Sequence, residues 1–244
     1  MNLSEMINKR KSVRKYNRNP LPTDVLEQIE QKMNTLKPLY PQIRVKGVIV
    51  NQEQVRFYFP WKAPHLIAIF SEEKDGYAEN VGFLYQQMDL YLQSRGIGSC
   101  WMGLGKIRDK EFINRYAEEG LKFVILLAFG YPDGDVTRTD LAQFKRKDPR
   151  EIADFADPVL EPARLAPSST NSQPWYFVHE NGRIHAFCSK AGILRHAMLG
   201  TMNRIDMGIA LAHLYVTNPD CFEFEKVSPL PYLDGYGYIG TVCL

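Results

Sequence analysis

The sequence lacks features that mark several classes of protein. Its longest apolar run, Phe123 to Phe129, is far too short to cross a bilayer, and the opening MNLSEMINKRKS lacks the apolar segment of a secretory signal peptide. The four cysteines are scattered without CxxC spacing, which argues against a metal site or a disulfide framework. We therefore expect reduced thiols, a cytoplasmic location and no membrane partner.

An excess of charge of one sign is also absent. The 30 Lys and Arg residues are balanced by 28 Asp and Glu residues, so the net charge of the 244-residue chain is only +2. Such a balance provides no electrostatic footprint for nucleic acid, which we do not expect as a partner. The 45% hydrophobic and 24% charged residues are ordinary globular values, and the chain is long enough to bury a core.

Hydrophobic periodicity predicts a mixture of helices and strands, and so an α+β fold. Apolar residues recur at helical spacing from about Tyr77 to Arg95, and Gly96 follows where a left-handed cap is needed. The sequence ENG between two apolar stretches predicts a hairpin turn. The remaining predicted helices cover 4–8, a segment from 23 and 202–216, and the predicted strands cover 65–70, 122–131, 176–178, 183–188 and the C-terminal YGYIGTVCL.

A weak internal repeat follows this order of elements. Val25 in DVLEQIEQ matches Val159 in PVLEPARL, and Gly82 in ENVGFLYQQM matches Gly208 in RIDMGIALAHL. RKSVR, which begins at residue 10, has a degraded echo in RKDPR at residue 146. Three matches in the same order with similar offsets favour a duplicated module, of which neither copy is complete alone.

Two loops carry unusual sets of hydrogen-bonding groups. Arg10, Lys11, Ser12 and Arg14 place cationic and hydroxyl donors together, which suits a phosphate but is also typical of a solvated basic turn. The loop APSSTNSQPW (166–175) offers short groups that both donate and accept, which suits the edge of a ring such as a flavin. A turn that caps a helix is the alternative.

A third segment, RGIGSCWMGLG (95–105), does not fit a dinucleotide fingerprint. The third glycine of GxGxxG would fall at Trp101, and the segment follows a helix rather than a strand. We expect instead a helix end that glycine permits and a close approach of the backbone to a ligand. Nothing basic adjoins Cys100 in the sequence, so we expect a small buried residue there rather than a reactive thiol.

Four segments together resemble the nitroreductase family of FMN-dependent oxidoreductases: KRKSVRKY, APSSTNSQPWYF, ENVGFLYQQMDLYLQSRGIGSCWMG and ILLAFGYPDG. The resemblance covers most of the chain. It implies an α/β sandwich, which in that family is usually an intertwined homodimer with FMN at the subunit interface. The arginine-serine-arginine segment of one subunit and the PSSxNxQPW loop of the other are expected to hold the FMN.

The chain departs from the family pattern in one respect. In the family the PSSxNxQPW loop follows the arginine segment within a few tens of residues, but here MNTLKPLYPQ (33–42) stands in that place. The resemblance therefore implies two degenerate copies fused in one chain as a pseudo-dimer. We expect the halves, 1–143 and 144–244, to intertwine into one unit that is a monomer.

The fusion predicts one FMN per chain, because only one complete site can be assembled. The opposite site would need a PSSxN loop in the first half and a GSCW segment in the second, and the sequence has neither. The residues that the resemblance assigns to the complete site are Arg10, Lys11, Ser12, Arg14, Cys100, Trp101, Met102, Gly103, Arg146, Pro167, Ser168, Ser169 and Asn171.

The resemblance also assigns roles and an activity. Arg10, Ser12 and Arg14 would contact the phosphate and pyrimidine edge of FMN, with Arg146 as a second phosphate partner. NADH or NADPH would reduce the flavin at N5, and a small acceptor such as a nitroaromatic or a quinone would take the hydride, so that no side chain is catalytic. The alternative is an FMN-binding protein with little turnover, a sensor or a store.

Overall fold

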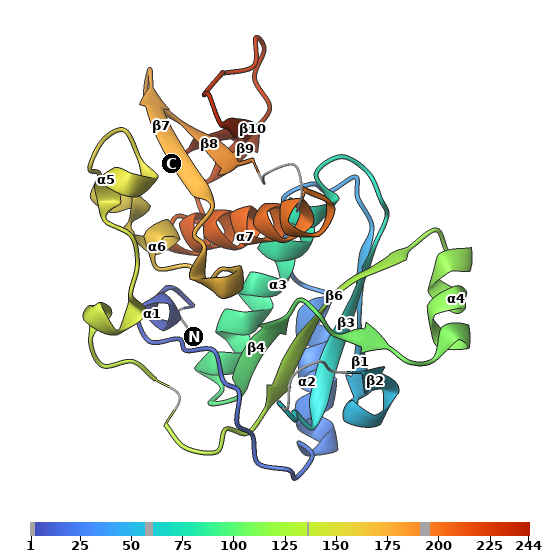
Figure 1. Ribbon diagram of the computed structural model, residues 1–244. Coiled ribbons are helices and arrows are strands. Elements are labelled where there is room, and N and C mark those ends of the chain that lie inside the picture. The colour runs from blue at the N-terminus through green and yellow to red at the C-terminus, as the bar shows by residue number, and fades with distance from the viewer. Residues whose placement is uncertain (1–2, 57–60, 136, 191–195) are drawn as a thin grey trace.

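Two four-stranded antiparallel sheets and two long helices form the centre of the molecule, for which a computed structural model describes residues 3–56, 61–135, 137–190 and 196–244 (Figure 1). Helix α3 (Tyr77–Ser94) packs against the first sheet, helix α7 (His196–Thr217) packs against the second, and the helices pack on each other. The first sheet contains β1 (Val45–Asn51), β3 (His65–Ser71), β4 (Gly98–Met102) and β6 (Lys122–Gly130); the second contains β7 (Trp175–Glu180), β8 (Arg183–Ser189), β9 (Glu223–Glu225) and β10 (Tyr236–Cys243).

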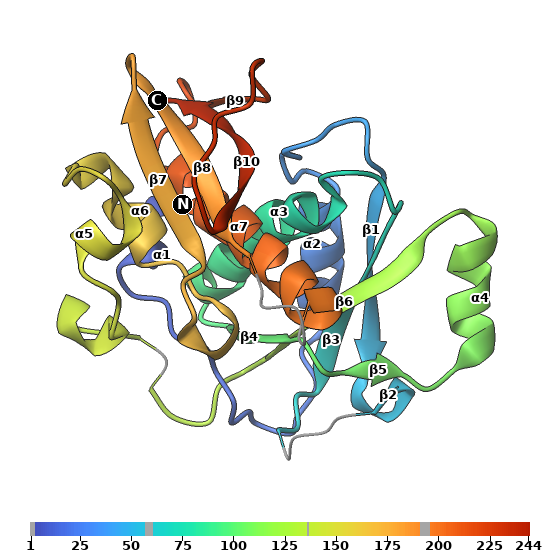
Figure 2. The same ribbon diagram turned by 45° about the horizontal axis from the view of Figure 1, so that its top comes forward.

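Both sheets are built in the same chain order. Two strands are followed by the long helix and then by two more strands, and the spatial orders are β1-β3-β6-β4 and β7-β8-β10-β9. In each sheet the first strand lies at one edge, the third lies at the other, and all neighbours run antiparallel. The two parts of the chain therefore share one topology (Figure 2).

Shorter elements surround this centre. The β2–β5 ribbon and α4 extend from the first sheet, and α5 and α6 lie beside the second (Figure 2). Their bounds are α1 (Ser4–Ile7), α2 (Thr23–Met33), β2 (Val55–Arg56), β5 (Lys106–Ile107), α4 (Lys110–Glu118), α5 (Pro149–Ile152) and α6 (Glu161–Arg164), with 3-10 turns at Gln52–Gln54, Leu141–Phe144, Pro158–Leu160 and Ser169–Asn171.

Strand β3 is buried along its whole length because both faces of the first sheet are covered. Ile67 and Ile69 belong to the core that faces α3. Phe70, on the opposite face, belongs to a second core that α4 and the N-terminal segment cover. Successive side chains of a strand point to opposite faces, so a strand buried on both sides reads as the continuous apolar run HLIAIF.

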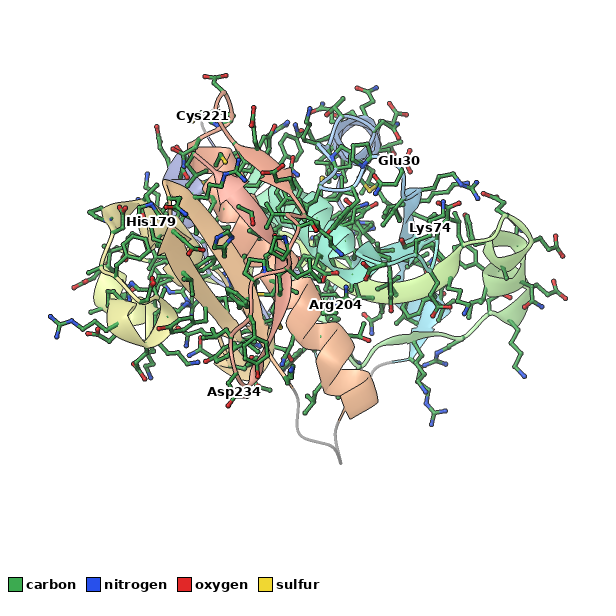
Figure 3. The ribbon with its side chains drawn as sticks, turned by 90° about the horizontal axis from the view of Figure 1, so that it is seen from above. Glu30, Lys74, His179, Arg204, Cys221 and Asp234 are labelled. Atoms are coloured by element: carbon green, nitrogen blue, oxygen red, sulfur yellow. The ribbon has the colours of Figure 1, made fainter. Side chains whose placement is uncertain are left out.

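The contact between α3 and α7 depends on two glycines placed reciprocally. A Cβ on Gly82 would strike the carbonyl oxygen of Ile205, and a Cβ on Gly208 would strike that of Glu79. Only glycine allows this close approach of the two backbones. Arg204 on α7, which is labelled in Figure 3, adds an ion pair to Glu79 of α3. Its Nε lies 2.6 Å from Oε1 of Glu79.

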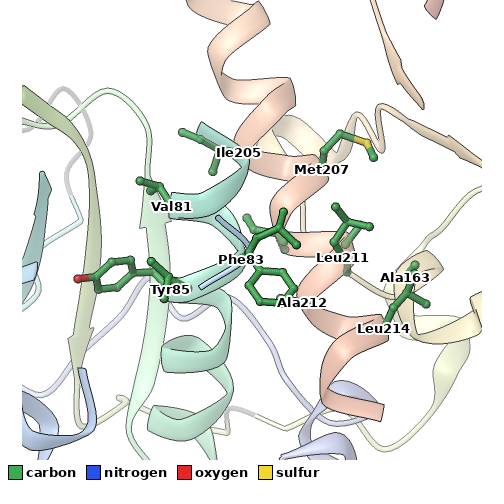
Figure 4. Packing of buried hydrophobic residues seen from close by; sticks show 14 of the residues in the cluster. Val81, Phe83, Tyr85, Ala163, Ile205, Met207, Leu211, Ala212 and Leu214 are labelled. Carbon is green, nitrogen blue, oxygen red and sulfur yellow. The ribbon is translucent and has the colours of Figure 1, made fainter. Parts of the chain in front are cut away.

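Apolar side chains of both helices fill the remainder of this contact (Figure 4). Val81 and Phe83 from α3 and Ile205 and Leu211 from α7 are all at most 2% exposed. They belong to a core cluster that also includes Trp175 of the second sheet. One apolar core therefore joins the two parts of the chain.

The structure confirms most of the predicted elements. Gly96 has the expected left-handed φ of 71°, and the β7–β8 hairpin turns at Asn181 and Gly182, with φ values of 53° and 75°. Helix α7, however, begins at His196, six residues before the predicted start. Strand β1 and helix α4 were not predicted. The GSCWM segment follows the end of α3 as expected, but it forms strand β4, which was also not predicted.

No helix within the described part of the chain is long and apolar enough to cross a membrane.

Candidate functional site

A cavity of about 270 Å³ brings together segments from both ends of the chain. Its wall is made by the N-terminal segment, by β4 and the turn after it, by the loop that begins at Pro167, and by residues 202–209 of α7. Nine predicted residues line it: Ser12, Arg14, Cys100, Trp101, Met102, Gly103, Pro167, Ser168 and Ser169. The two unusual loops of the sequence therefore meet at one place, although more than 150 residues separate them.

The N-terminal segment is held against β4 by backbone pairing. Val13 donates its N–H to the carbonyl of Ser99 at 2.9 Å, and Ser12 forms a parallel bridge with Ser99. Lys11 is exposed, and its backbone N–H and carbonyl pair with the side-chain amide of Gln93 at 3.1 and 3.0 Å. The pairing thus directs Ser12 and Arg14 toward the cavity and leaves Lys11 outside it.

Arg10 lies beneath the cavity wall rather than in it. Its side chain is 1% exposed, and its Nε is 2.9 Å from Oδ2 of Asp89, which is fully buried. Its Nη2 donates to Oγ of Ser12 at 3.1 Å. Ser99 Oγ donates to the second Asp89 oxygen at 2.5 Å. The buried ion pair therefore fixes the Ser12 hydroxyl, which does line the cavity.

The loop at 167–173 is anchored from α7. The N–H of Ser169 donates to both carboxyl oxygens of Asp206, at 3.1 and 3.0 Å, and the N–H of Gln173 donates to Ser168 Oγ at 2.9 Å. Thr170, Asn171 and Gln173 all have left-handed φ, between 48° and 60°. Such strained conformations in residues other than glycine cluster at functional sites.

Asp206 is an acidic group in the cavity wall that sequence reasoning missed. It is 4% exposed, and burial raises the pKa of its carboxyl group to about 8. The hydrogen bond from the Ser169 N–H lowers the pKa but does not outweigh burial. The internal repeat could have pointed to it, because Asp206 stands two residues before Gly208, just as Asn80 stands two residues before the matching Gly82. Trp61 and Met202 also line the cavity and were not predicted.

Arg146 and Asn171 lie beside the cavity but do not line it. Arg146 donates to Asn171 Oδ1 and, at 2.8 and 3.1 Å, to the carbonyls of Phe144 and Leu165. Its Nε is buried without a hydrogen-bond partner. Burial and the charges of Arg10, Arg138 and Arg164 lower its pKa to about 9. We call Arg10, Arg138, Arg146 and Arg164 the arginine cluster.

The arginine cluster reaches the cavity through two contacts. Arg10 bonds Ser12, a wall residue, and Arg146 bonds Asn171, which follows the wall residue Thr170. A buried guanidinium nitrogen without a partner, next to a cavity, suits an anionic group such as a phosphate. The residues present therefore fit FMN, with ring space in the cavity and cations at its border.

Cys100 is 4% exposed in the cavity wall, and burial raises the pKa of its thiol, in keeping with the small buried residue expected there. Gly103 borders Met202, whose Sδ would lie 3.1 Å from a Cβ at that position. A side chain at Gly103 would therefore crowd the wall of the cavity.

Comparison with known proteins establishes the family. The family described as “Putative TM nitroreductase” matches residues 2–218, so the chain belongs to this nitroreductase family. The solved structure of a “putative nitroreductase” from Thermotoga maritima MSB8 superimposes with a TM-score of 0.66 at 23% identity, covering 99% of this chain and 92% of that one. This likeness shows that the mixed α+β fold is that of a nitroreductase structure.

Other solved structures match about 60% of the chain. An FMN-dependent nitroreductase from Clostridium difficile R20291 has a TM-score of 0.43 at 16% identity and covers 60% of this chain and 98% of its own. A protein described as a putative NADH oxidase from Clostridium acetobutylicum has a TM-score of 0.44 at 15% identity and covers 60% of this chain and 96% of its own. No curated protein matches the sequence.

Proposed function

We propose that the protein is an FMN-dependent oxidoreductase that uses NADH or NADPH to reduce small acceptors such as nitroaromatics and quinones. One observation carries the proposal: the predicted arginine-serine and PSSxN segments, from opposite ends of the chain, border a single cavity beside the arginine cluster. A solvated basic turn would not explain why Arg10 is buried and why Ser12 faces that cavity.

The chain's own residues would bind and orient the cofactor. The guanidinium of Arg146 and the Ser12 hydroxyl, which Arg10 holds, would face the phosphate side, and Arg14 would face the pyrimidine edge, where a cation stabilises the charge of reduced flavin. Ser168, Ser169 and the Asn171–Arg146 pair would hold the ring and the ribityl chain. The backbone at Met102 and Gly103 would approach N5. Bound FMN would supply the hydride transfer itself.

We also propose that the chain is a fused pseudo-dimer of halves 1–143 and 144–244. Three observations support this: the shared topology of the two sheets, the reciprocal contacts of Gly82 and Gly208, and a correspondence of 126 residues between α3 and α7. Asn80 accepts from the backbone N–H groups of Leu39 and Tyr40 at 2.9 Å, as Asp206 accepts from Ser169. Fusion would make a monomer sufficient for function.

An absorption experiment tests this function. The purified protein should carry a flavin band equivalent to one FMN per chain, and the band should bleach when NADH or NADPH is added without oxygen. A band that does not bleach would favour the alternative of a flavin-binding protein with little turnover. A ratio near two would contradict the single site, and failure to bind added FMN would contradict the function altogether.

A further inference from the structure

Arg138 belongs to the arginine cluster although no sequence motif points to it. Its backbone N–H donates to the carbonyl of Lys9 at 2.8 Å, and the adjacent Thr137 forms an antiparallel bridge with Arg10. Its Nη1 donates to the carbonyl of Arg10, and its guanidinium lies 4.1 Å from the ring centroid of the buried Phe144. Backbone and ring together fix this guanidinium in one position.

Two of the four arginines in the cluster have carboxylate partners and two do not. Arg10 pairs with Asp89, and Arg164 pairs with Glu161 through both Nε and Nη2 at 2.6 Å. Within the described ranges, no carboxylate forms an ion pair with Arg138 or Arg146. Burial and the charge of Arg10 lower the pKa of Arg138 to about 10.

Unpaired cations that are partly buried are costly unless an anion compensates them. Arg138 and Arg146 also share a neighbour, because both guanidinium groups lie over the ring of Phe144, at 4.1 and 5.6 Å from its centroid. This shared contact holds two forks of donors close together before any ligand arrives, which lowers the entropy lost on binding. A phosphate dianion matches such an arrangement in charge and geometry.

We propose that Arg138, together with Arg146, binds the 5′-phosphate of FMN and makes the site select FMN over riboflavin. The two flavins have the same ring system and ribityl chain and differ only in the phosphate. This inference rests on the proposed function, since it names a further residue of the same cofactor site. Arg138 is a specificity-determining residue, because it reads the one group by which the two ligands differ.

The test compares the dissociation constants of FMN and riboflavin, measured by flavin fluorescence with the full-length protein freed of bound flavin. The main variant is Arg138→Gln. The matched control is Arg164→Gln, which removes a positive charge from the same cluster but one that Glu161 already balances. Arg138→Lys, which keeps the charge without the planar fork, serves as a second variant if the first does not fold, and thermal unfolding verifies the fold of each.

We expect Arg138→Gln to lower FMN affinity about 10- to 100-fold, the range for a lost hydrogen bond to a charged group, and to leave riboflavin affinity within about twofold. Arg138→Lys should lower FMN affinity less, and Arg164→Gln should preserve the preference for FMN. Inorganic phosphate should compete with FMN and not with riboflavin.

Three outcomes would overturn the inference. Equal losses for both flavins would indicate a purely structural role for Arg138. An unchanged FMN preference in Arg138→Gln and Arg138→Lys would remove the residue from the phosphate site. A changed ratio of the NADPH-dependent to the NADH-dependent rate, with the FMN preference intact, would assign Arg138 to the nicotinamide cofactor instead. These results differ from failure of the wild-type protein to bind FMN, which would contradict the proposed function itself.

Discussion

Two regions of the molecule occupy corresponding places on α3 and α7, and only one of them contains the cavity. On α7 the cavity is lined by Met202, Ile205 and Asp206, with Ser168 and Ser169 opposite. The positions 126 residues earlier are Gly76, which caps the start of α3, and Glu79 and Asn80 of α3, and Leu39 and Tyr40 face them. We call this second place the filled region.

Large and charged side chains occupy the filled region. The ring of Tyr40 packs edge-on against Phe224, with centroids 5.4 Å apart, and lies so close to Gly76 that a Cβ there would be 2.6 Å from it. Glu79 and Asp75 pair with Arg204, and Asp75 also pairs with Lys226. The backbone hydrogen bonds of the two regions are alike, so side-chain size and charge decide which region has space for a ligand.

The largest effect is expected when a tyrosine like Tyr40 of the filled region is introduced into the cavity wall. Ser169→Tyr places in the cavity wall the ring that Tyr40 places in the filled region, and the backbone bond from residue 169 to Asp206 can remain. We expect FMN binding to fall below detection, because the ring would occupy the space of the flavin. Bound flavin is measured by visible absorbance after gel filtration.

Ser172→Tyr is the control for this change, since Ser172 is exposed outside the cavity wall. It should retain the flavin content of the wild type. Retention of stoichiometric FMN by a folded Ser169→Tyr protein would mean that the cavity described here is not the flavin site.

The reverse substitution opens the filled region. Tyr40→Ser removes a buried ring, and we expect the free energy of unfolding to fall by about 3–5 kcal/mol, the cost of deleting a buried aromatic side chain. The FMN content should stay at one per chain, because Arg204 and Lys226 are already paired with carboxylates. Denaturant unfolding monitored by circular dichroism gives the stability.

Tyr40→Phe is the matched control, because the Tyr40 hydroxyl is buried without a hydrogen-bond partner. Removing it should leave stability unchanged or slightly increased. A large loss in Tyr40→Phe would reveal a partner for the hydroxyl, and a loss below about 1 kcal/mol in Tyr40→Ser would show that the ring does not hold this region together.

The sequence predicted the parts of this comparison that depend on local pattern. The periodicity of α3, the apolar run of β3 and the ENG turn each have a local cause, and the structure confirms all three. Strand β1 was missed although the β-branched residues of VKGVIVN favour a strand, so this segment was predictable from local pattern as well. Strand β4 was missed because Gly98 and the glycines that flank the strand favour a loop, whereas pairing with the distant β6 makes it a strand.

The candidate site was predictable as a set of segments but not as an arrangement. Nine of the assigned residues line the cavity, whereas Arg10 turns inward to Asp89, a carboxylate 79 residues away that no local pattern links to it. Asn171 is turned toward Arg146 by a left-handed backbone that a single sequence does not reveal. The filled region was inferred only from missing motifs, and the structure adds the side chains that occupy it.

Asp206 and Asn80 occupy corresponding positions on α7 and α3, and the comparison between them can be tested through the pH dependence of stability. Burial raises the pKa of Asp206 from its ordinary value of 3.8 to about 8 in the folded protein. Between these values the folded state keeps a proton that the unfolded state has released. The free energy of unfolding should therefore fall as pH rises toward 8, by at most about 1.4 kcal/mol per pH unit, and level off above that.

Asp206→Asn replaces this titrating group with the residue type that α3 uses, and an amide oxygen can still accept from Ser169 as Asn80 accepts from Leu39 and Tyr40. We expect a flatter stability curve between pH 5 and 8, with the largest gain over the wild type near pH 8, measured by urea unfolding at each pH. Asp24→Asn, which removes an exposed carboxylate, should follow the wild-type curve. Parallel curves for Asp206→Asn and the wild type would mean that Asp206 is already ionised in the folded protein at pH 5, so that the two regions differ here in charge as well as in side-chain size.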